Sequence, residues 1–314
     1  MFASLTKFFP GWIGIKHSSI TENKEVTKAN VLIKILHIHA EFAARADLQP
    51  CTETNKLYSD LVDICTLPVT EEFSNTILEN PRILEILHEL RNFCSLIEFN
   101  TEKYWSLKAA GSEDATEQEV CTRIKEIPNI DINMSLIRNE LSAIRDVSQK
   151  PIESIAIIGS GPLPLTGFGL TGLPFDTPTN IRTLNIDREL DAIETAKTLS
   201  DRLGSKCTGM EFLCADASST LDLTEFDAVY LAILVGNTQQ EKEHLLKNLT
   251  SQMRPGALLI VRGTTKLKRL MYSVFDPTTE SVAQILDVET TVFPKNHYIV
   301  DSVIIGRVKA VNLV

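Results

Sequence analysis

Hydrophobic positions follow two different rhythms along the chain, and the rhythm changes near residue 150. Before that point apolar residues recur at helical spacing, which predicts amphipathic helices. The first such stripe comprises Val31, Ile35, Ile38 and Phe42. After residue 150, short apolar runs alternate with longer amphipathic segments, which is typical of βαβ units around a parallel sheet. We therefore predict a helical N-terminal domain (residues 1–150) and an α/β domain (residues 151–314).

The second half contains five strand-like runs, and two more follow near its end. The five are residues 155–158, 182–186, 211–214, 228–235 and 257–261. Helix-like segments between them include residues 189–203 and 239–253. The last two runs, residues 288–293 and 298–308, are joined by Pro-Lys-Asn-His. Their closeness predicts an antiparallel hairpin at one edge of the sheet.

A turn rich in glycine and proline follows the first strand-like run, where the chain reads Ile-Ala-Ile-Ile-Gly-Ser-Gly-Pro-Leu-Pro-Leu. Gly159 and Gly161 lack a Cβ atom, so the backbone can turn tightly and approach a ligand closely. Pro162 and Pro164 remove backbone N–H donors, whereas a pyrophosphate site needs free N–H groups at a helix start. The turn therefore favours a nucleoside without phosphates, of which S-adenosylmethionine (SAM) is the commonest; a plain turn is the alternative. The candidate contacts are Gly159, Ser160, Gly161 and Pro162.

Acidic and small residues follow the next strands, where such sheets bind their ligands. Asp187 ends the second strand and would bind the ribose hydroxyls, or cap the next helix. Asp216 follows the third strand and would accept the adenine amino group, with Ala217 offering a backbone donor; its alternative is a turn or a helix cap. Leu234 and Val235 end the fourth strand and would wall the adenine or the sulfonium.

Composition narrows the classes of partner. The net charge of −10 and pI of about 5.2 argue against nucleic acid and anionic membranes. No apolar run approaches a membrane-spanning length, and the first residues lack a signal-peptide pattern. The six cysteines form no CxxC pair, which indicates reduced thiols in a cytoplasmic protein. The histidines are isolated or, as in His37-x-His39, poorly spaced for chelation, so we expect no metal site.

Several longer strings resemble the nicotianamine synthase family. They are residues 158–166 (Ile-Gly-Ser-Gly-Pro-Leu-Pro-Leu-Thr), 226–236, 255–262 and 301–305, with Tyr272 and Asp276-Pro277. The resemblance covers nearly all of the second domain and is thinner over the first, where residues 96–100 match best. It implies a Rossmann-like domain of the SAM-dependent methyltransferase type with a terminal antiparallel hairpin, capped by a helical domain, and a reaction cavity between the two.

The chain departs from the plant members of that family at three places. Thr265 stands where they carry His, Asp301 where they carry Asn, and Phe293-Pro294 where they carry His-Pro. These differences indicate a fungal or other non-plant member. They leave the detailed substrate contacts open.

The resemblance also implies a reaction, in which three SAM molecules condense by aminobutyrate transfer to nicotianamine and release three methylthioadenosines. SAM is then the substrate and no other cofactor is expected; the product, not the enzyme, binds metal ions. Three alternatives stay open: a single aminobutyrate transfer to another amine, an ordinary SAM-dependent methyltransferase, and a non-catalytic SAM-binding protein. The sequence also leaves open a homodimer, to which the aromatic residues 1–20 would contribute.

Aminobutyrate transfer needs an unprotonated amine, so a general base is expected. Glu98 is the candidate, because it lies at the edge of an apolar helical stripe, where desolvation raises the pKa of a carboxyl. The family resemblance points to the same residue. The alternative is a surface glutamate paired with Arg91 or Lys103.

Three further side chains are candidates for substrate contact. Tyr104 would orient Glu98 or bond the amine, or it simply packs. Arg262 would hold a substrate carboxylate in a two-point fork, or it forms an inter-strand ion pair. Tyr272 is a weaker candidate for a substrate contact.

Overall fold

The computed structural model describes residues 27–173, 179–294 and 300–310. The predicted role of the N-terminal aromatic residues therefore lies outside the described residues. The chain forms two compact units. Unit 1 comprises Met1–Thr101, Ile127–Asn129 and Thr265–Tyr272, and unit 2 comprises Glu102–Glu126, Ile130–Thr264 and Ser273–Val314. The units are groups of mutually contacting residues, and a domain boundary at residue 150 stays a prediction.

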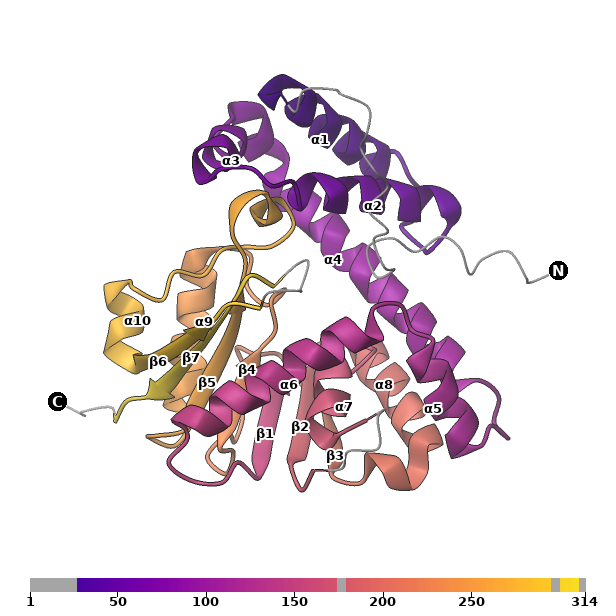
Figure 1. The fold of residues 1–314 in the computed structure, drawn as a ribbon, viewed down its shortest axis with the longest axis vertical. Helices are drawn as coiled ribbons and strands as arrows, with labels where there is room; N and C mark the ends of the chain where they lie inside the picture. Colours follow the sequence, from indigo (N-terminus) through magenta and orange to yellow (C-terminus); the bar gives the residue numbers. More distant parts are fainter. Residues whose placement is uncertain (1–26, 174–178, 295–299, 311–314) are drawn as a thin grey trace. The chain divides into compact units, whose positions relative to one another are not determined.

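Unit 1 is helical, as its hydrophobic stripes predict. Its elements are α1 (Lys28–Ala43), α2 (Thr52–Cys65), α3 (Glu71–Leu78), the first part of α4 (Pro81–Ala110) and the 3-10 helix η3 (Lys266–Leu270). In this unit α1 packs on α2 and α3, and η3 packs on the same two helices (Figure 1). The stripe predicted for α1 is buried. Side chains of Thr27, Cys51 and Thr70 accept backbone N–H groups where α1, α2 and α3 begin, which satisfies donors that a helix start leaves free.

Unit 2 is built on a seven-stranded sheet with the order β3-β2-β1-β4-β5-β7-β6. The strands are β1 (Ser154–Ile158), β2 (Arg182–Asp187), β3 (Met210–Cys214), β4 (Ala228–Leu231), β5 (Leu258–Gly263), β6 (Leu286–Val292) and β7 (Ser302–Val308). The first five are parallel, and β7 pairs antiparallel with both β5 and β6. The predicted methyltransferase-type α/β fold with a terminal antiparallel hairpin is therefore confirmed.

One predicted strand is too long. Residues 228–235 were expected to be extended, but β4 ends at Leu231. The chain then turns, because the Val235 N–H donates to the Ala232 carbonyl and Gly236 adopts a φ of +81°. Leu234 and Val235 consequently lie in the loop after the strand and not in the strand itself.

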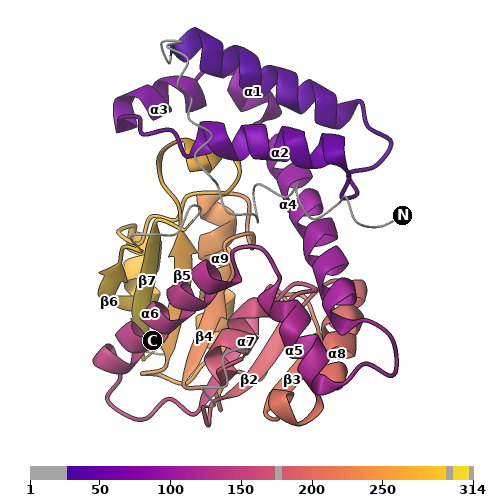
Figure 2. The ribbon, with the colours of Figure 1, turned by 45° about the vertical axis from the view of Figure 1, so that its right-hand side comes forward.

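Helices cover both faces of the sheet. They are α5 (Glu117–Lys125), α6 (Ile130–Val147), α7 (Leu165–Thr171), α8 (Leu190–Leu203), α9 (Gln239–Ser251) and α10 (Glu280–Ile285). Figure 1 and Figure 2 show α6 and α7 on one face, with α9 on the other. The cluster behind α9 and α10 joins Leu246, Leu249 and Val282 to the β-strand residues Ile158 and Leu259, all fully or almost fully buried. Burial of these apolar side chains stabilises the sheet and the helices that pack on it.

The strand order reverses direction between β1 and β4. In open α/β sheets a ligand binds outside the carboxyl ends of the strands at such a reversal. The loops after β1 and β4 are therefore where a ligand site is expected.

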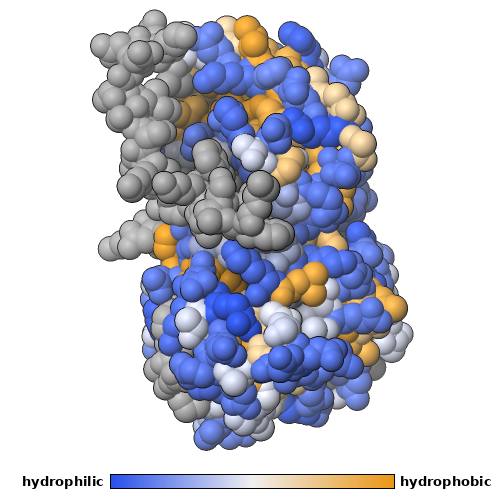
Figure 3. Space-filling model, turned by 90° about the vertical axis from the view of Figure 1, so that its right-hand side faces the viewer, coloured by the Kyte–Doolittle hydropathy of each residue, from blue (hydrophilic) through white to orange (hydrophobic). Residues whose placement is uncertain are grey.

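The surface in the view of Figure 3 is mainly hydrophilic, with hydrophobic side chains in small groups. Within the part of the chain that the structure describes, no helix combines the length and apolarity needed to cross a bilayer.

Candidate functional site

The turn after β1 is held in a fixed shape by β2. Gly159 and Gly161 adopt φ values of +78° and +69°, a region that favours glycine. The N–H groups of Gly159 and Ser160 both donate to the Ile186 carbonyl, at 2.8 and 3.0 Å. The Gly161 N–H donates to Oδ2 of Asp187 at 2.9 Å. Glycine at these two positions thus fulfils the conformational requirement that the sequence predicted.

Two other segments of unit 2 approach this turn closely. A Cβ atom on Gly159 would lie 2.5 Å from Cγ2 of Val235, so the loops after β1 and β4 are in contact. A Cβ atom on Gly161 would collide with the carboxylate of Glu102, at the unit 2 end of α4. Gly161 therefore lies between two carboxylates, those of Asp187 and Glu102, which makes this turn suited to a cationic ligand.

One polar atom of the turn is buried without a partner. Oγ of Ser160 is inaccessible to solvent and has no hydrogen-bond partner among the described residues. Such atoms are rare in folded proteins, and a bound ligand is one way in which they are satisfied. Ser160 was a predicted ligand contact, and this is the kind of site that a ligand hydroxyl or amine would complete.

Asp187 also accepts a hydrogen bond from the segment just before the next helix, α8. Its Oδ1 accepts the Glu189 N–H at 3.0 Å, just before α8, while its Oδ2 holds Gly161. The N-cap residue of α8 is Glu189, and no side-chain capping bond is present there, so Asp187 forms a turn before the helix and the capping alternative is wrong. Each carboxylate oxygen can accept more than one hydrogen bond, so the predicted contact with ribose hydroxyls stays a prediction.

The loop after β4 is supported by a buried lysine that the sequence did not single out. Lys242 on α9 is 0 % exposed, and its Nζ donates to the carbonyls of Val235 (2.8 Å) and Ile233 (3.2 Å). The Ser273 hydroxyl donates to the next carbonyl, that of Gly236, at 2.7 Å. A lysine is rarely fully buried unless it is paired, so these bonds fix the loop that carries Leu234 and Val235.

Asp216 forms a local turn. Its Oδ1 accepts the N–H and the hydroxyl of Ser218, at 2.8 and 2.6 Å, and these bonds lower the pKa of the carboxyl. The turn that the sequence offered as the alternative is thus present. The carbonyl of Ala217 accepts from the Asn248 side chain at 3.1 Å. Contacts of Asp216 and Ala217 with an adenine ring stay predictions.

Arg262 is used inside the protein. Its Nε and Nη2 donate to the two carboxylate oxygens of Glu140 on α6, at 2.8 and 2.7 Å, and its Nη1 donates to Thr166 at 3.2 Å. Both arms of the fork are therefore occupied by a protein carboxylate. The alternative, an inter-strand ion pair, is observed as an ion pair between β5 and α6, and binding of a substrate carboxylate by Arg262 stays a prediction.

Glu98 is the centre of a second group of candidates, which lies in unit 1. Its side chain is 7 % exposed, and Oε1 accepts hydrogen bonds from the hydroxyls of both Tyr58 and Tyr272, the latter at 2.5 Å. Tyr58 comes from α2 and Tyr272 from the segment after η3. Tyr272 was predicted as a substrate contact, whereas Tyr58 was missed.

The cations proposed as alternative partners of Glu98 are engaged elsewhere. Arg91 donates to the Arg269 carbonyl at 2.7 Å, and Lys103 bonds to the Asp191 carboxylate. Glu98 is therefore a buried, tyrosine-bonded carboxyl rather than a paired surface glutamate. Burial raises its pKa to about 7, against the opposing effect of the hydrogen bonds from Tyr272 and Tyr58. The expected rise in pKa is thus found.

Tyr104 lies six residues beyond Glu98 on α4 and belongs to unit 2. Residues that share a helix face are three or four positions apart, so the two side chains leave the helix in different directions. The Tyr104 ring packs edge-on against Trp105, with 5.5 Å between ring centroids. An interaction between Tyr104 and Glu98 stays a prediction.

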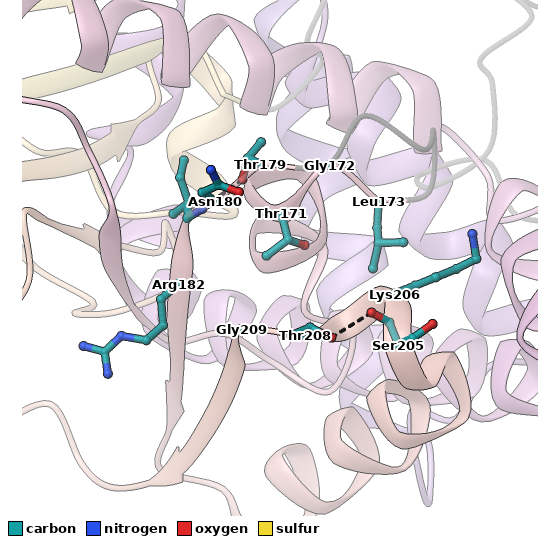
Figure 4. A pocket seen from close by; sticks show the side chains of 11 residues that line it. Thr171, Gly172, Leu173, Thr179, Asn180, Arg182, Ser205, Lys206, Thr208 and Gly209 are labelled. Atoms are coloured by element: carbon teal, nitrogen blue, oxygen red, sulfur yellow. Dashed lines mark hydrogen bonds between the residues drawn. The ribbon is translucent and has the colours of Figure 1, made fainter.

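A pocket of about 690 Å³ opens elsewhere in unit 2. Arg182, at the first residue of β2, and Gly209, just before β3, line it (Figure 4). It therefore lies at the amino ends of these strands, whereas the Gly159–Gly161 turn follows a carboxyl end. None of the predicted site residues lines it. Across the described residues, no three His, Cys, Asp or Glu side chains are grouped to hold a metal ion.

Comparison with known proteins gives a consistent result along almost the whole chain. The family model described as nicotianamine synthase protein matches residues 22–313. Nicotianamine synthase 9 of Hordeum vulgare is 31% identical over 292 residues, which cover 91% of this chain and 81% of that protein. Nicotianamine synthase of Solanum lycopersicum is 27% identical over 278 residues, 88% of this chain and 83% of the relative.

Solved structures show the same fold at lower identity. The crystal structure of MtNAS in complex with MTA and tNA has a TM-score of 0.73 and 16% identity, covering 91% of this chain and 100% of that one. A variant of MtNAS in complex with S-adenosylmethionine has a TM-score of 0.70 and 18% identity, covering 89% and 98%. These structures show the fold, and the family match and the 31% identical relative establish that the chain belongs to the nicotianamine synthase family.

Proposed function

We propose that this protein is an enzyme that condenses three SAM molecules to nicotianamine by successive transfer of the 3-amino-3-carboxypropyl group. The observation that carries the proposal is the family match over residues 22–313. The MtNAS structures with S-adenosylmethionine and with MTA and tNA support the same substrate class. Because nicotianamine binds metal ions, the proposed reaction belongs to metal homeostasis.

In this proposal the turn after β1 binds SAM. Gly159, Gly161 and Pro162 shape the turn, and the unpartnered hydroxyl of Ser160 bonds the ligand. Asp187 and Asp216 bind the ribose and the adenine amino group through lone pairs that their local bonds leave free. Ala217 offers a backbone donor, and Leu234 and Val235 wall the adenine or the sulfonium. The carboxylates of Asp187 and Glu102 next to Gly161 suit the positive charges of the sulfonium and the ammonium group of SAM.

The proposed chemical step is a displacement at carbon. The lone pair of an acceptor amine attacks the γ-carbon of the aminobutyrate arm of SAM, the C–N bond forms, and the C–S bond breaks with its electrons going to sulfur. The neutral leaving group is methylthioadenosine, and the proton lost by the amine passes to Glu98. A base with a pKa near 7 is half ionised at neutral pH, which is the range where general bases are most effective.

The test is mass spectrometry after incubation of the purified protein with SAM alone. We expect nicotianamine and about three methylthioadenosines for each product molecule. Methylthioadenosine with a shorter product would mean fewer condensations or another amine acceptor. S-adenosylhomocysteine would instead identify a methyltransferase, and SAM binding without turnover would identify a binding protein.

The role of Glu98 is tested by Glu98→Gln, which keeps the side-chain shape but removes the base. We expect SAM affinity to change by less than about threefold and turnover to fall by about 10²–10⁴-fold. Glu85→Gln is the matched control, because Glu85 is an exposed glutamate on the same helix α4. Near-normal turnover of Glu98→Gln would exclude Glu98 as the base.

We further propose a cytoplasmic location and no nucleic-acid or membrane partner, on the basis of the acidic charge and the cysteine pattern. A homodimer is an open prediction, which light scattering of the full chain would decide.

A further inference from the structure

The two hydrogen bonds to Glu98 are unequally distributed over its carboxylate. Both tyrosine hydroxyls donate to Oε1, and within the described residues Oε2 receives no hydrogen bond. Tyr58 and Tyr272 are themselves 5 % and 2 % exposed, so water does not compete readily for their hydroxyls. The carboxylate is thus held by one oxygen and keeps the other for a partner.

A further titratable neighbour of Glu98 is a thiol. Cys94, one turn earlier on α4, interacts electrostatically with Glu98 and is fully buried. Burial raises the pKa of the Cys94 thiol well above its usual value, so it is neutral at physiological pH. Burial also raises the pKa values of Tyr58 and Tyr272, which therefore stay protonated donors. Among these described groups around Glu98, Glu98 itself is the one whose pKa lies near neutrality.

We propose that Tyr58 and Tyr272 are positioning residues for Glu98: they hold Oε1 in place and leave Oε2 to receive the proton of the attacking amine. This inference rests on the proposed function. The proton moves from nitrogen to Oε2 as the C–N bond forms and the C–S bond breaks, and the two tyrosines keep their own protons throughout. Neither tyrosine needs to touch the substrate.

The pair also has an electrostatic effect. A hydroxyl donor bonds an ionised carboxylate more strongly than a neutral carboxyl, so each tyrosine stabilises the basic form of Glu98. Without them, burial alone would leave more of Glu98 protonated at neutral pH. The pair therefore lets a carboxylate be buried and still act as a base.

The experiment measures methylthioadenosine release against pH for Tyr58→Phe, Tyr272→Phe and the double variant. We expect the acid limb of the profile to move to higher pH by about one unit for each single variant and further for the double variant. At pH 7 turnover of each single variant should fall about fivefold, and raising the pH should restore it in part, because the ionised fraction of Glu98 recovers. Tyr230→Phe, which removes a buried hydroxyl in unit 2, is the matched control and should leave the limb in place.

A second readout is independent of turnover. Infrared titration, with the Glu98→Gln spectrum subtracted, isolates the carboxyl band of Glu98, and its midpoint should rise in both tyrosine variants. An unchanged midpoint and an unchanged acid limb would overturn the inference while the proposed function stands. If the wild-type protein releases no methylthioadenosine, the proposed function fails, and the infrared midpoint still decides whether the tyrosines act on Glu98. If a tyrosine variant lost rate at every pH while the infrared midpoint of Glu98 stayed unchanged, Tyr58 and Tyr272 would contribute only to packing.

Discussion

The Arg262 guanidinium and the Glu140 carboxylate form a two-point ion pair inside unit 2, with bonds of 2.8 and 2.7 Å that link β5 to α6. The Glu140 side chain is fully buried, and that of Arg262 is 15% exposed. Each charge is therefore removed from water and depends on the other for compensation. The pair gives Arg262 a structural task that the sequence analysis treated as the lesser alternative.

Removing one member of this pair should be more damaging than removing both. Arg262→Met or Glu140→Leu leaves a buried charge without its partner, and we expect each to lower the free energy of unfolding by about 3–5 kcal/mol. The double variant Arg262→Met with Glu140→Leu should lose less than the sum of two single variants. Urea unfolding at pH 7 provides the measurement, and strict additivity would contradict the expectation.

Gly161 should be needed for ligand binding more than for stability. Alanine at a positive φ costs about 1–2 kcal/mol, and here its Cβ would also push the Glu102 carboxylate aside. Gly256→Ala is a matched control, because Gly256 has a φ of +85° and nothing within 4 Å of an added Cβ. We expect similar losses of stability for both variants, since the end of a glutamate side chain can move.

The two glycine variants should differ in SAM affinity, measured by calorimetry. Gly161→Ala should weaken binding about tenfold, the effect of losing one charge-assisted contact, whereas Gly256→Ala should bind as the wild type does. Equal affinities would mean that neither Glu102 nor the geometry of this turn contributes to ligand binding.

Some parts of the fold and of the candidate site could be predicted from the sequence, and others could not. The parallel strands were predictable because a buried strand is a short apolar run between turn residues. The end of β4 was not, since Ala-Ile-Leu-Val continues the apolar run as far as Gly236 without a break. Glu98 could be found from its place on an apolar stripe. Tyr58 could not, because a tyrosine in the stripe of Leu61 and Cys65 reads as ordinary core packing.

Contacts between residues far apart in the chain could not be predicted from the sequence either. Glu140 and Arg262 are separated by 122 positions, and no local pattern links them. Lys242 was missed for a different reason: lysine is usually exposed, so its burial depends entirely on the carbonyls that the β4 loop presents to it.

The raised pKa of Glu98 predicts a specific pH dependence of stability. The pKa is about 7 in the folded protein, against an ordinary value of 4.5. Between these values the folded state binds more protons than the unfolded state, so the contribution of Glu98 to stability is full below about pH 4.5 and is lost as pH rises through 7. The contribution amounts to about 3 kcal/mol.

Glu98→Gln removes this dependence, because glutamine does not titrate. We expect the stability of the variant relative to the wild type to increase by about 3 kcal/mol from pH 4.5 to pH 8, measured by urea unfolding in matched buffers. Comparing the two proteins cancels the titration of all other groups. A difference that does not vary with pH would show that Glu98 has an ordinary pKa.

Lys242 should influence SAM binding without taking part in chemistry. Lys242→Met keeps most of the buried stem but leaves the carbonyls of Ile233 and Val235 without their charged donor. We expect a loss of stability of about 1.5–3 kcal/mol and a rise in KM for SAM, since Val235 contacts the proposed SAM-binding turn at Gly159. Methylthioadenosine release at saturating SAM should stay within about twofold of the wild type, because an interaction that only shapes the binding site changes KM rather than kcat.

The control is Lys247→Met, which replaces an exposed lysine on the same helix and should change neither stability nor the KM for SAM. An unchanged KM together with reduced stability would limit Lys242 to the packing of α9 on the sheet.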